Sequence, residues 1–121
     1  MIRRLLLVLL GGTLGTAARL AIALLIPDSA AGFPLATLIV NAFGALLIGV
    51  LAARVQALSE LRIFFGTGVL GGFTTYSALA VGTVELWTDA PFVAASYALA
   101  SLAVGVGAAV LGERLGRRRP R

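Results

Sequence analysis

A chain of 121 residues that is 60% hydrophobic and only 12% charged is too apolar to stay in solution as a folded domain. It has no cysteine and no histidine, which excludes disulfides, zinc sites, cysteine nucleophiles and histidine acid–base chemistry. Its net charge of +5 comes from arginine alone, and arginines at the ends of apolar segments orient membrane proteins more often than they bind nucleic acid. We therefore expect an integral membrane protein that is not an enzyme and does not bind nucleic acid.

Four apolar stretches are long enough to cross a bilayer, which takes about 20 helical residues. The predicted spans cover residues 5–26, 33–53, 61–86 and 91–113. Short links separate them, namely Pro27, Asp28 and Ser29, then residues 56–60, then a tight turn at 87–90. No room remains for a soluble domain, so residues 1–121 are expected to form one all-α transmembrane domain with four helices.

Arginines gather on one side of this topology. Four spans place both termini and the central link on the same side, and that side carries nine arginines: Arg3, Arg4, Arg54, Arg62, Arg114, Arg117, Arg118, Arg119 and Arg121. The opposite loops carry Asp28 and Asp89 and no arginine. The positive-inside rule then predicts cytoplasmic termini and a single orientation.

Residues 66–79 of the third span read GTGVLGGFTTYSAL, so glycines and hydroxyl side chains occur inside an apolar segment. A break in a transmembrane helix is tolerated only where protein or a water-filled cavity replaces lipid. We expect Gly71 and Gly72 to loosen the helix and nearby hydroxyls to satisfy the freed backbone groups. The third helix is therefore predicted to be broken near residues 71–75, at a functional site. The alternative is a continuous glycine-rich helix that only packs closely on its neighbours.

Two polar side chains lie inside the first two spans. Arg19 is costly in a membrane, and it either snorkels to the surface or places a fixed positive charge in a water-filled vestibule. Asn41 lies near the middle of its span, where snorkelling is impossible. Its amide either joins two helices by hydrogen bonds or faces a pore.

Hydroxyl groups extend this polar set into the last two spans. Tyr97 and Ser101 share one face of the fourth helix, and Thr74, Thr75 and Ser77 follow the glycine pair in the third. The track is rich in hydrogen-bond donors and has no carboxylate at mid-membrane. Such a track, with an arginine at its mouth, suits a small anion.

Short motifs run through the first three spans in a fixed order. They are Gly11-Gly12, Gly15, Arg19, Phe33-Pro34, Thr37-Leu38, Val40-Asn41, Gly44, Thr67-Gly68, Gly71-Gly72-Phe73-Thr74-Thr75 and Ser77. Together they resemble the small bacterial fluoride-channel family, Fluc or CrcB, over nearly the whole chain. Their joint occurrence in a four-span chain of this length is specific.

The resemblance implies a fluoride channel in the bacterial cell (inner) membrane that lowers cytoplasmic fluoride by passive efflux. It implies an antiparallel dimer of four-helix subunits with two ion paths, so the partners are fluoride, the bilayer and an oppositely oriented subunit. A structural sodium ion at the dimer centre would be held by the backbone carbonyls of Gly71 and Thr74. Arg19 corresponds to the vestibule arginine, and the ion path corresponds to Asn41, Phe73, Tyr76, Ser77, Tyr97 and Ser101.

The third span also departs from the family pattern. Where the family continues TTFSTF, this chain has Tyr76 in place of the first phenylalanine and Leu79 in place of the second, and Gly82 stands where a glutamate is common. The strong charge bias also opposes self-pairing in an inverted arrangement. These features favour one half of a heterodimer, with an inverted homologue supplying the missing rings, over a homodimer.

Two other functions compete with a channel. A small multidrug exporter has similar size but needs a carboxylate in the first span, and residues 5–26 contain none. A membrane assembly subunit that conducts nothing would use Arg19, Asn41 and the glycines for packing only.

Overall fold

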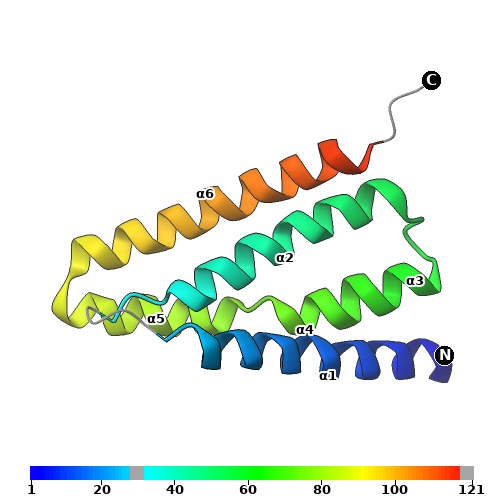
Figure 1. Ribbon diagram of the computed structural model, residues 1–121, viewed down its shortest axis with the longest axis horizontal. Helices are drawn as coiled ribbons and strands as arrows, with labels where there is room; N and C mark the ends of the chain where they lie inside the picture. The colour runs from blue at the N-terminus through cyan, green and yellow to red at the C-terminus, as the bar shows by residue number, and fades with distance from the viewer. Residues whose placement is uncertain (28–31, 118–121) are drawn as a thin grey trace.

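The computed structural model describes residues 1–27 and 32–117, and within these residues it consists of helices and short links (Figure 1). The elements in chain order are α1 (Ile2–Leu25), α2 (Leu35–Arg54), α3 (Glu60–Arg62), the π-helix η1 (Ile63–Leu70), α4 (Gly71–Phe73), α5 (Tyr76–Asp89) and α6 (Pro91–Gly116). Within this described part of the chain, four helical stretches are long and apolar enough to cross a membrane, with α3 to α5 together forming the third. The predicted four-helix, all-α architecture is therefore confirmed.

The helix ends differ from the predicted spans by a few residues. α2 begins at Leu35 because Pro34 precedes it, and a proline disfavours helical backbone in the residue before it, here Phe33. The turn expected at 87–90 is shorter, since α5 continues to Asp89 and only Ala90 separates it from Pro91 at the start of α6. The turn expected at Asp28 and Ser29 lies outside the described residues, as do Arg118, Arg119 and Arg121.

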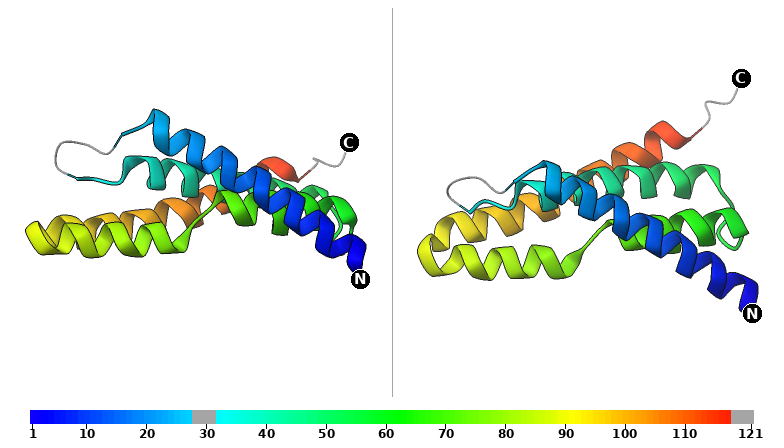
Figure 2. Two further views of the ribbon diagram at one scale, coloured as in Figure 1. Left: turned by 90° about the horizontal axis from the view of Figure 1, so that it is seen from below. Right: turned by 60° about the horizontal axis from the view of Figure 1, so that its bottom comes forward.

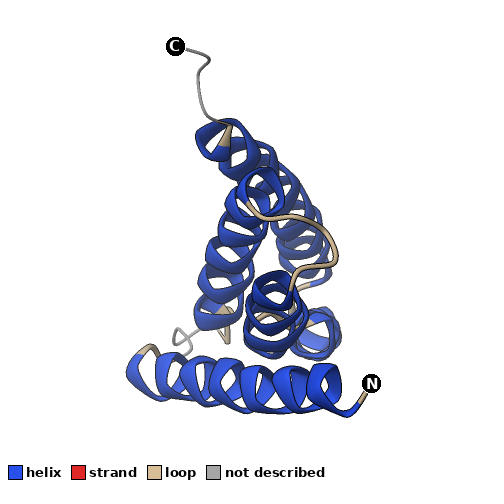
Figure 3. Ribbon diagram, turned by 90° about the vertical axis from the view of Figure 1, so that its right-hand side faces the viewer, coloured by secondary structure: helices blue, strands red, loops and turns tan. Residues whose placement is uncertain are grey.

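The helices pack as two close pairs. α6 lies along α2, and α1 lies against η1 and α4, while α5 joins the pairs by packing on α6. Figure 2 shows that α1 crosses the third span obliquely, and Figure 3 shows it as a separate layer at one side of the molecule. η1 and α2 belong to different pairs and make few contacts with each other.

Glycines lie at the helix–helix contacts within both pairs. A Cβ atom added at Gly49 would lie 2.1 Å from the carbonyl oxygen of Ala109, and one at Gly112 would lie 2.0 Å from that of Leu46. In the other pair, a Cβ at Gly15 would lie 1.9 Å from the carbonyl oxygen of Val69. These positions admit only glycine, because the backbones of neighbouring helices touch there.

The third span is broken at Thr74 and Thr75, whose backbones are extended, with ψ of 155° and 121°. The predicted break is thus confirmed, and it falls just after Gly71 and Gly72, which remain helical at the end of the π-helix η1. Gly72 is needed for close approach: a Cβ there would lie 2.4 Å from the carbonyl oxygen of Gly12. The chain resumes as α5 because the Thr75 hydroxyl accepts a hydrogen bond from the N–H of Ala78 as its N-cap.

Candidate functional site at the helix break

Asn41 on α2 holds the broken backbone by two hydrogen bonds. Its Nδ2 donates to the carbonyl oxygen of Thr75 at 2.9 Å, and its Oδ1 accepts from the N–H of Thr75 at 2.8 Å. The amide therefore replaces the intrahelical partners that Thr75 lost at the break. A side chain on α2 thus fixes the position of the break in the third span.

Arg19 and Thr16 on α1 hold the other side of the break. The Arg19 Nε and the Thr16 hydroxyl both donate to the carbonyl oxygen of Gly72, each at 3.3 Å. In a continuous α-helix this carbonyl would accept from the N–H of Tyr76. The structure therefore places Arg19 at the break, where it is partly buried.

Two carbonyl groups at the break have lost their helical donors. In a continuous helix the carbonyl of Gly71 would accept from Thr75 and that of Thr74 from Ala78, but those N–H groups bond to Asn41 and to the Thr75 hydroxyl. The hydrogen bonds among the described residues give neither carbonyl another donor. Backbone oxygens freed in this way suit a hard cation.

A groove of about 350 Å³ opens beside the break, between α2 and α6. We call it the polar groove; its polar lining residues are Asn41, Thr74, Thr75, Tyr76 and Ser101. Its remaining lining is apolar, and none of its lining residues is acidic or basic. A groove of this kind offers amide and hydroxyl donors to an anion without a carboxylate to repel it.

Ser101 carries a buried hydroxyl in the wall of the polar groove. The residue is only 8% exposed, and its Oγ has no hydrogen-bond partner among the described residues. Buried hydroxyls ordinarily find a partner, so this hydroxyl is a candidate to bind a ligand or water in the groove.

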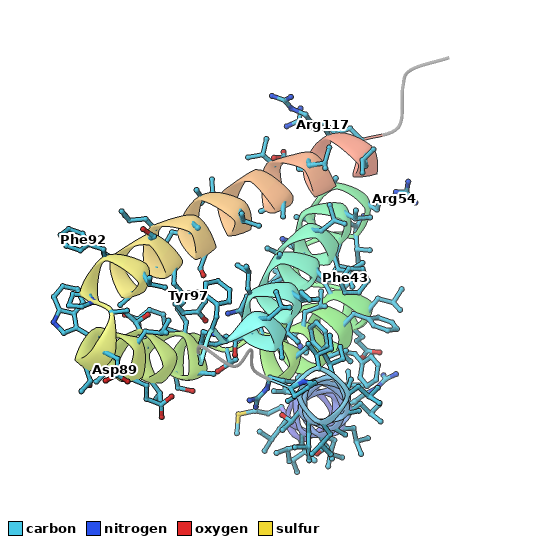
Figure 4. All side chains as sticks on the ribbon, turned by 60° about the vertical axis from the view of Figure 1, so that its left-hand side comes forward. Phe43, Arg54, Asp89, Phe92, Tyr97 and Arg117 are labelled. Carbon is cyan, nitrogen blue, oxygen red and sulfur yellow. The ribbon has the colours of Figure 1, made fainter. Side chains whose placement is uncertain are left out.

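The structure gathers only some of the predicted site residues at the polar groove. Asn41, Tyr76 and Ser101 line it, and the Tyr76 side chain is largely exposed. Phe73 is buried with its ring against Gly44, and Tyr97 points inward from α6, with its ring edge-to-face with Phe33 at 5.2 Å (Figure 4). The exposed Ser77 lies 3.1 Å from the Thr75 hydroxyl, oxygen to oxygen, and does not line the groove.

A second, smaller cavity of about 100 Å³ lies on the side of the break that faces α1. Its polar lining residues are Arg19, Thr37 and Thr75. Thr75 lines both this cavity and the polar groove, so the segment that Asn41 holds lies between the two spaces. Thr16 and Thr37 are functional candidates that the sequence did not single out as site residues, although Thr37 falls within the motifs quoted above. Thr75 is already part of the predicted polar track.

Replacing Ser101 by alanine separates a ligand role from a structural one. Removing a buried hydroxyl that has no partner should leave the stability of the protein unchanged or slightly higher, because its desolvation is no longer uncompensated. If the hydroxyl contacts a passing anion, flux should fall by about tenfold, the cost of one hydrogen bond to a charged group. Measuring thermal stability in detergent and flux in liposomes tests both, with the exposed Ser96→Ala as the control on the same helix.

The fold and the break define a small multi-pass membrane protein with a polar groove at its centre. The chain belongs to the family of CrcB-like proteins (Camphor Resistance, CrcB), whose pattern matches residues 6–113. It is 42% identical over 113 residues to the fluoride-specific ion channel FluC of Paracoccus denitrificans, covering 91% of each chain. It is 48% identical over 119 residues to the protein of the same name from Thermus thermophilus, covering 93% of this chain and 94% of that one.

Proposed function

We propose that this protein is a subunit of a fluoride-selective channel that releases fluoride passively across the bacterial cell membrane. The observation that carries the proposal is the unpaired, buried Ser101 hydroxyl in a groove that also exposes the Asn41 amide. Fluoride is small and strongly hydrated, so a pore must replace its water with close donors. The two relatives described above are named as channels, which agrees with the expectation that the chain is not an enzyme.

The proposed route links the two cavities through the segment held by Asn41. Arg19 would attract the anion into the smaller cavity, and Thr75 and Asn41 would form the narrow passage to the polar groove. Ser101 would then receive the ion on α6. In this route Asn41 has two tasks, since it fixes the backbone with one amide hydrogen and keeps the other for the anion.

A second subunit in the opposite orientation would complete the path. The polar groove is open along one side, and Gly105 on its wall has no atom within 4 Å of an added Cβ. The exposed ring of Tyr76 would then lie against the partner instead of lipid. A homodimer and a heterodimer both satisfy this requirement, and the one-sided arginines favour the heterodimer. The same bias supports cytoplasmic termini.

The freed carbonyls of Gly71 and Thr74 fit a structural sodium ion. One chain supplies only two such oxygens, which is too few for a hard cation, whereas two inverted chains would supply four. Bound there, sodium would neutralise the carbonyl dipoles at the centre of the dimer. The residues of this chain would contribute backbone oxygens only, so side-chain substitutions at Thr74 should leave the ion in place.

Fluoride efflux from liposomes tests the proposal, with the protein purified alone and then co-purified with an inverted homologue. Efflux from the protein alone would show a self-sufficient channel and would contradict the heterodimer. Efflux only with the partner would establish an obligate pair. Folded protein that gives no fluoride efflux in either preparation would refute the channel proposal and favour a membrane assembly subunit. Drug-dependent proton flux would instead favour a multidrug exporter.

A further inference from the structure

An apolar groove of about 420 Å³ runs between α2 and η1, apart from the polar groove. We call it the apolar groove; its walls include Leu47 and Leu51 on α2 and Phe65 and Val69 on η1. It exists because α2 packs on α6 while η1 packs on α1, so the two helices that form its walls make few contacts with each other. In a membrane, an acyl chain of a lipid can enter such a groove.

Arg54 is the one charged residue that lines this groove, and it lies at the C-terminal end of α2. Its Nε and Nη2 donate to the carbonyl oxygens of Gly116 and Leu115 at the end of α6, both at 3.3 Å. These bonds hold the guanidinium at the end of α6, while the side chain of Arg54 also lines the groove. The other terminal nitrogen, Nη1, makes no hydrogen bond within the described part of the chain, so it remains available to a phosphate oxygen.

The charge at this end of the molecule is strongly positive. Six arginines of the described residues lie there: Arg3, Arg4, Arg54, Arg62, Arg114 and Arg117. The carboxylates at the same end are already engaged, since Glu60 pairs with Arg3 at 2.8 Å and Glu113 pairs with Arg117. Figure 4 shows Arg54 and Arg117 at this end and Asp89 at the opposite one. An anionic headgroup is thus attracted to the end of the molecule at which Arg54 lines the apolar groove.

We propose that the apolar groove binds one anionic phospholipid, with an acyl chain against Leu47, Leu51 and Val69 and the phosphate at Arg54. The bound lipid would fill the gap between the two helix pairs. Its phosphate would contact the guanidinium of Arg54, which already joins the end of α2 to the end of α6. This site is independent of the ion path, because no residue of the polar groove lines it.

Native mass spectrometry of the purified full chain tests the site, with phosphatidylglycerol and phosphatidylcholine as probes. The wild type should retain phosphatidylglycerol in preference to phosphatidylcholine. Arg54→Gln should weaken phosphatidylglycerol binding about fivefold, the effect of about 1 kcal/mol per basic residue at a lipid surface. Arg54→Lys should keep most of the binding, and Arg114→Gln, an exposed arginine at the same end that does not line the groove, should resemble the wild type.

Three outcomes would overturn the proposal. Equal losses in Arg54→Gln and Arg114→Gln would show diffuse charge attraction without a site. Equal retention of the two lipids by the wild type would show a groove that selects no headgroup. Because the chain has no cysteine, a Val69→Cys variant carries a single thiol, and efficient disulfide cross-linking through it would show that a second copy of the chain covers the groove. If Arg54→Gln does not fold, the retention of the two lipids by the wild type and by Arg54→Lys still tests whether the groove selects an anionic headgroup.

Discussion

Replacing Asn41 by aspartate should reduce fluoride efflux to the background of empty liposomes. A carboxylate at this position can still accept from the N–H of Thr75, but it cannot donate to the carbonyl oxygen of Thr75 as Nδ2 does at 2.9 Å. It would also place a negative charge between the two cavities, where an anion must pass. Charge of one sign at a constriction is among the strongest determinants of ion selectivity.

Replacing Asn41 by alanine separates these two effects. Alanine adds no charge but leaves the N–H and the carbonyl of Thr75 unpaired, at about 1–3 kcal/mol for each buried group. We therefore expect a less stable protein with residual efflux from Asn41→Ala, and no efflux from Asn41→Asp.

The matched control is Ile48→Leu, which alters the wall of the polar groove two turns along α2 without adding a polar group. Its efflux should equal that of the wild type. Thermal stability in detergent and efflux in liposomes should be measured on the same preparations. Wild-type efflux from Asn41→Asp would refute the passage proposed at this residue.

The position of the break illustrates what the sequence can and cannot predict. Glycines and hydroxyls in an apolar stretch predict a broken helix, and the third span is indeed broken. However, Gly71 and Gly72 are helical and the break follows at Thr74 and Thr75, because the bonds that stabilise it come from Asn41, more than 30 residues earlier. Only the packing of α2 against the third span determines which residue Asn41 reaches.

The polar residues inside the spans could be recognised from the sequence, but their hydrogen-bond partners could not. Arg19 and Asn41 were recognisable because a charged or amide group inside a span needs a partner. Their partners are backbone groups of Gly72 and Thr75, and no pattern of side chains along the chain identifies those. Tyr97 and Ser101 share a face of α6 as predicted, but only Ser101 lines the polar groove, since Tyr97 is buried beside Phe33.

The largest loss of stability should follow from Gly15→Ala. The added methyl group would lie 1.9 Å from the carbonyl oxygen of Val69 and 2.8 Å from the N–H nitrogen of Phe73, and neither backbone atom can move without shifting a helix. Overpacking of this kind costs about 1–3 kcal/mol, and more where the neighbour is rigid. Displacement of the third span would also draw the carbonyl of Gly72 away from Arg19 and Thr16, so efflux should fall as well.

Gly12→Ala is the matched control, because the same change is made less than one turn earlier on α1. The nearest atom to its added methyl group is the carbonyl oxygen of Gly68, at 4.0 Å, which is an ordinary contact. Alanine also favours a helix over glycine by about 1 kcal/mol, so this variant should be as stable as the wild type or slightly more so. Unfolding by denaturing detergent, followed by the helical circular dichroism signal, compares the two variants. Equal stabilities would show that α1 does not pack on the third span through Gly15, and the position of Arg19 at the break would then lose its support.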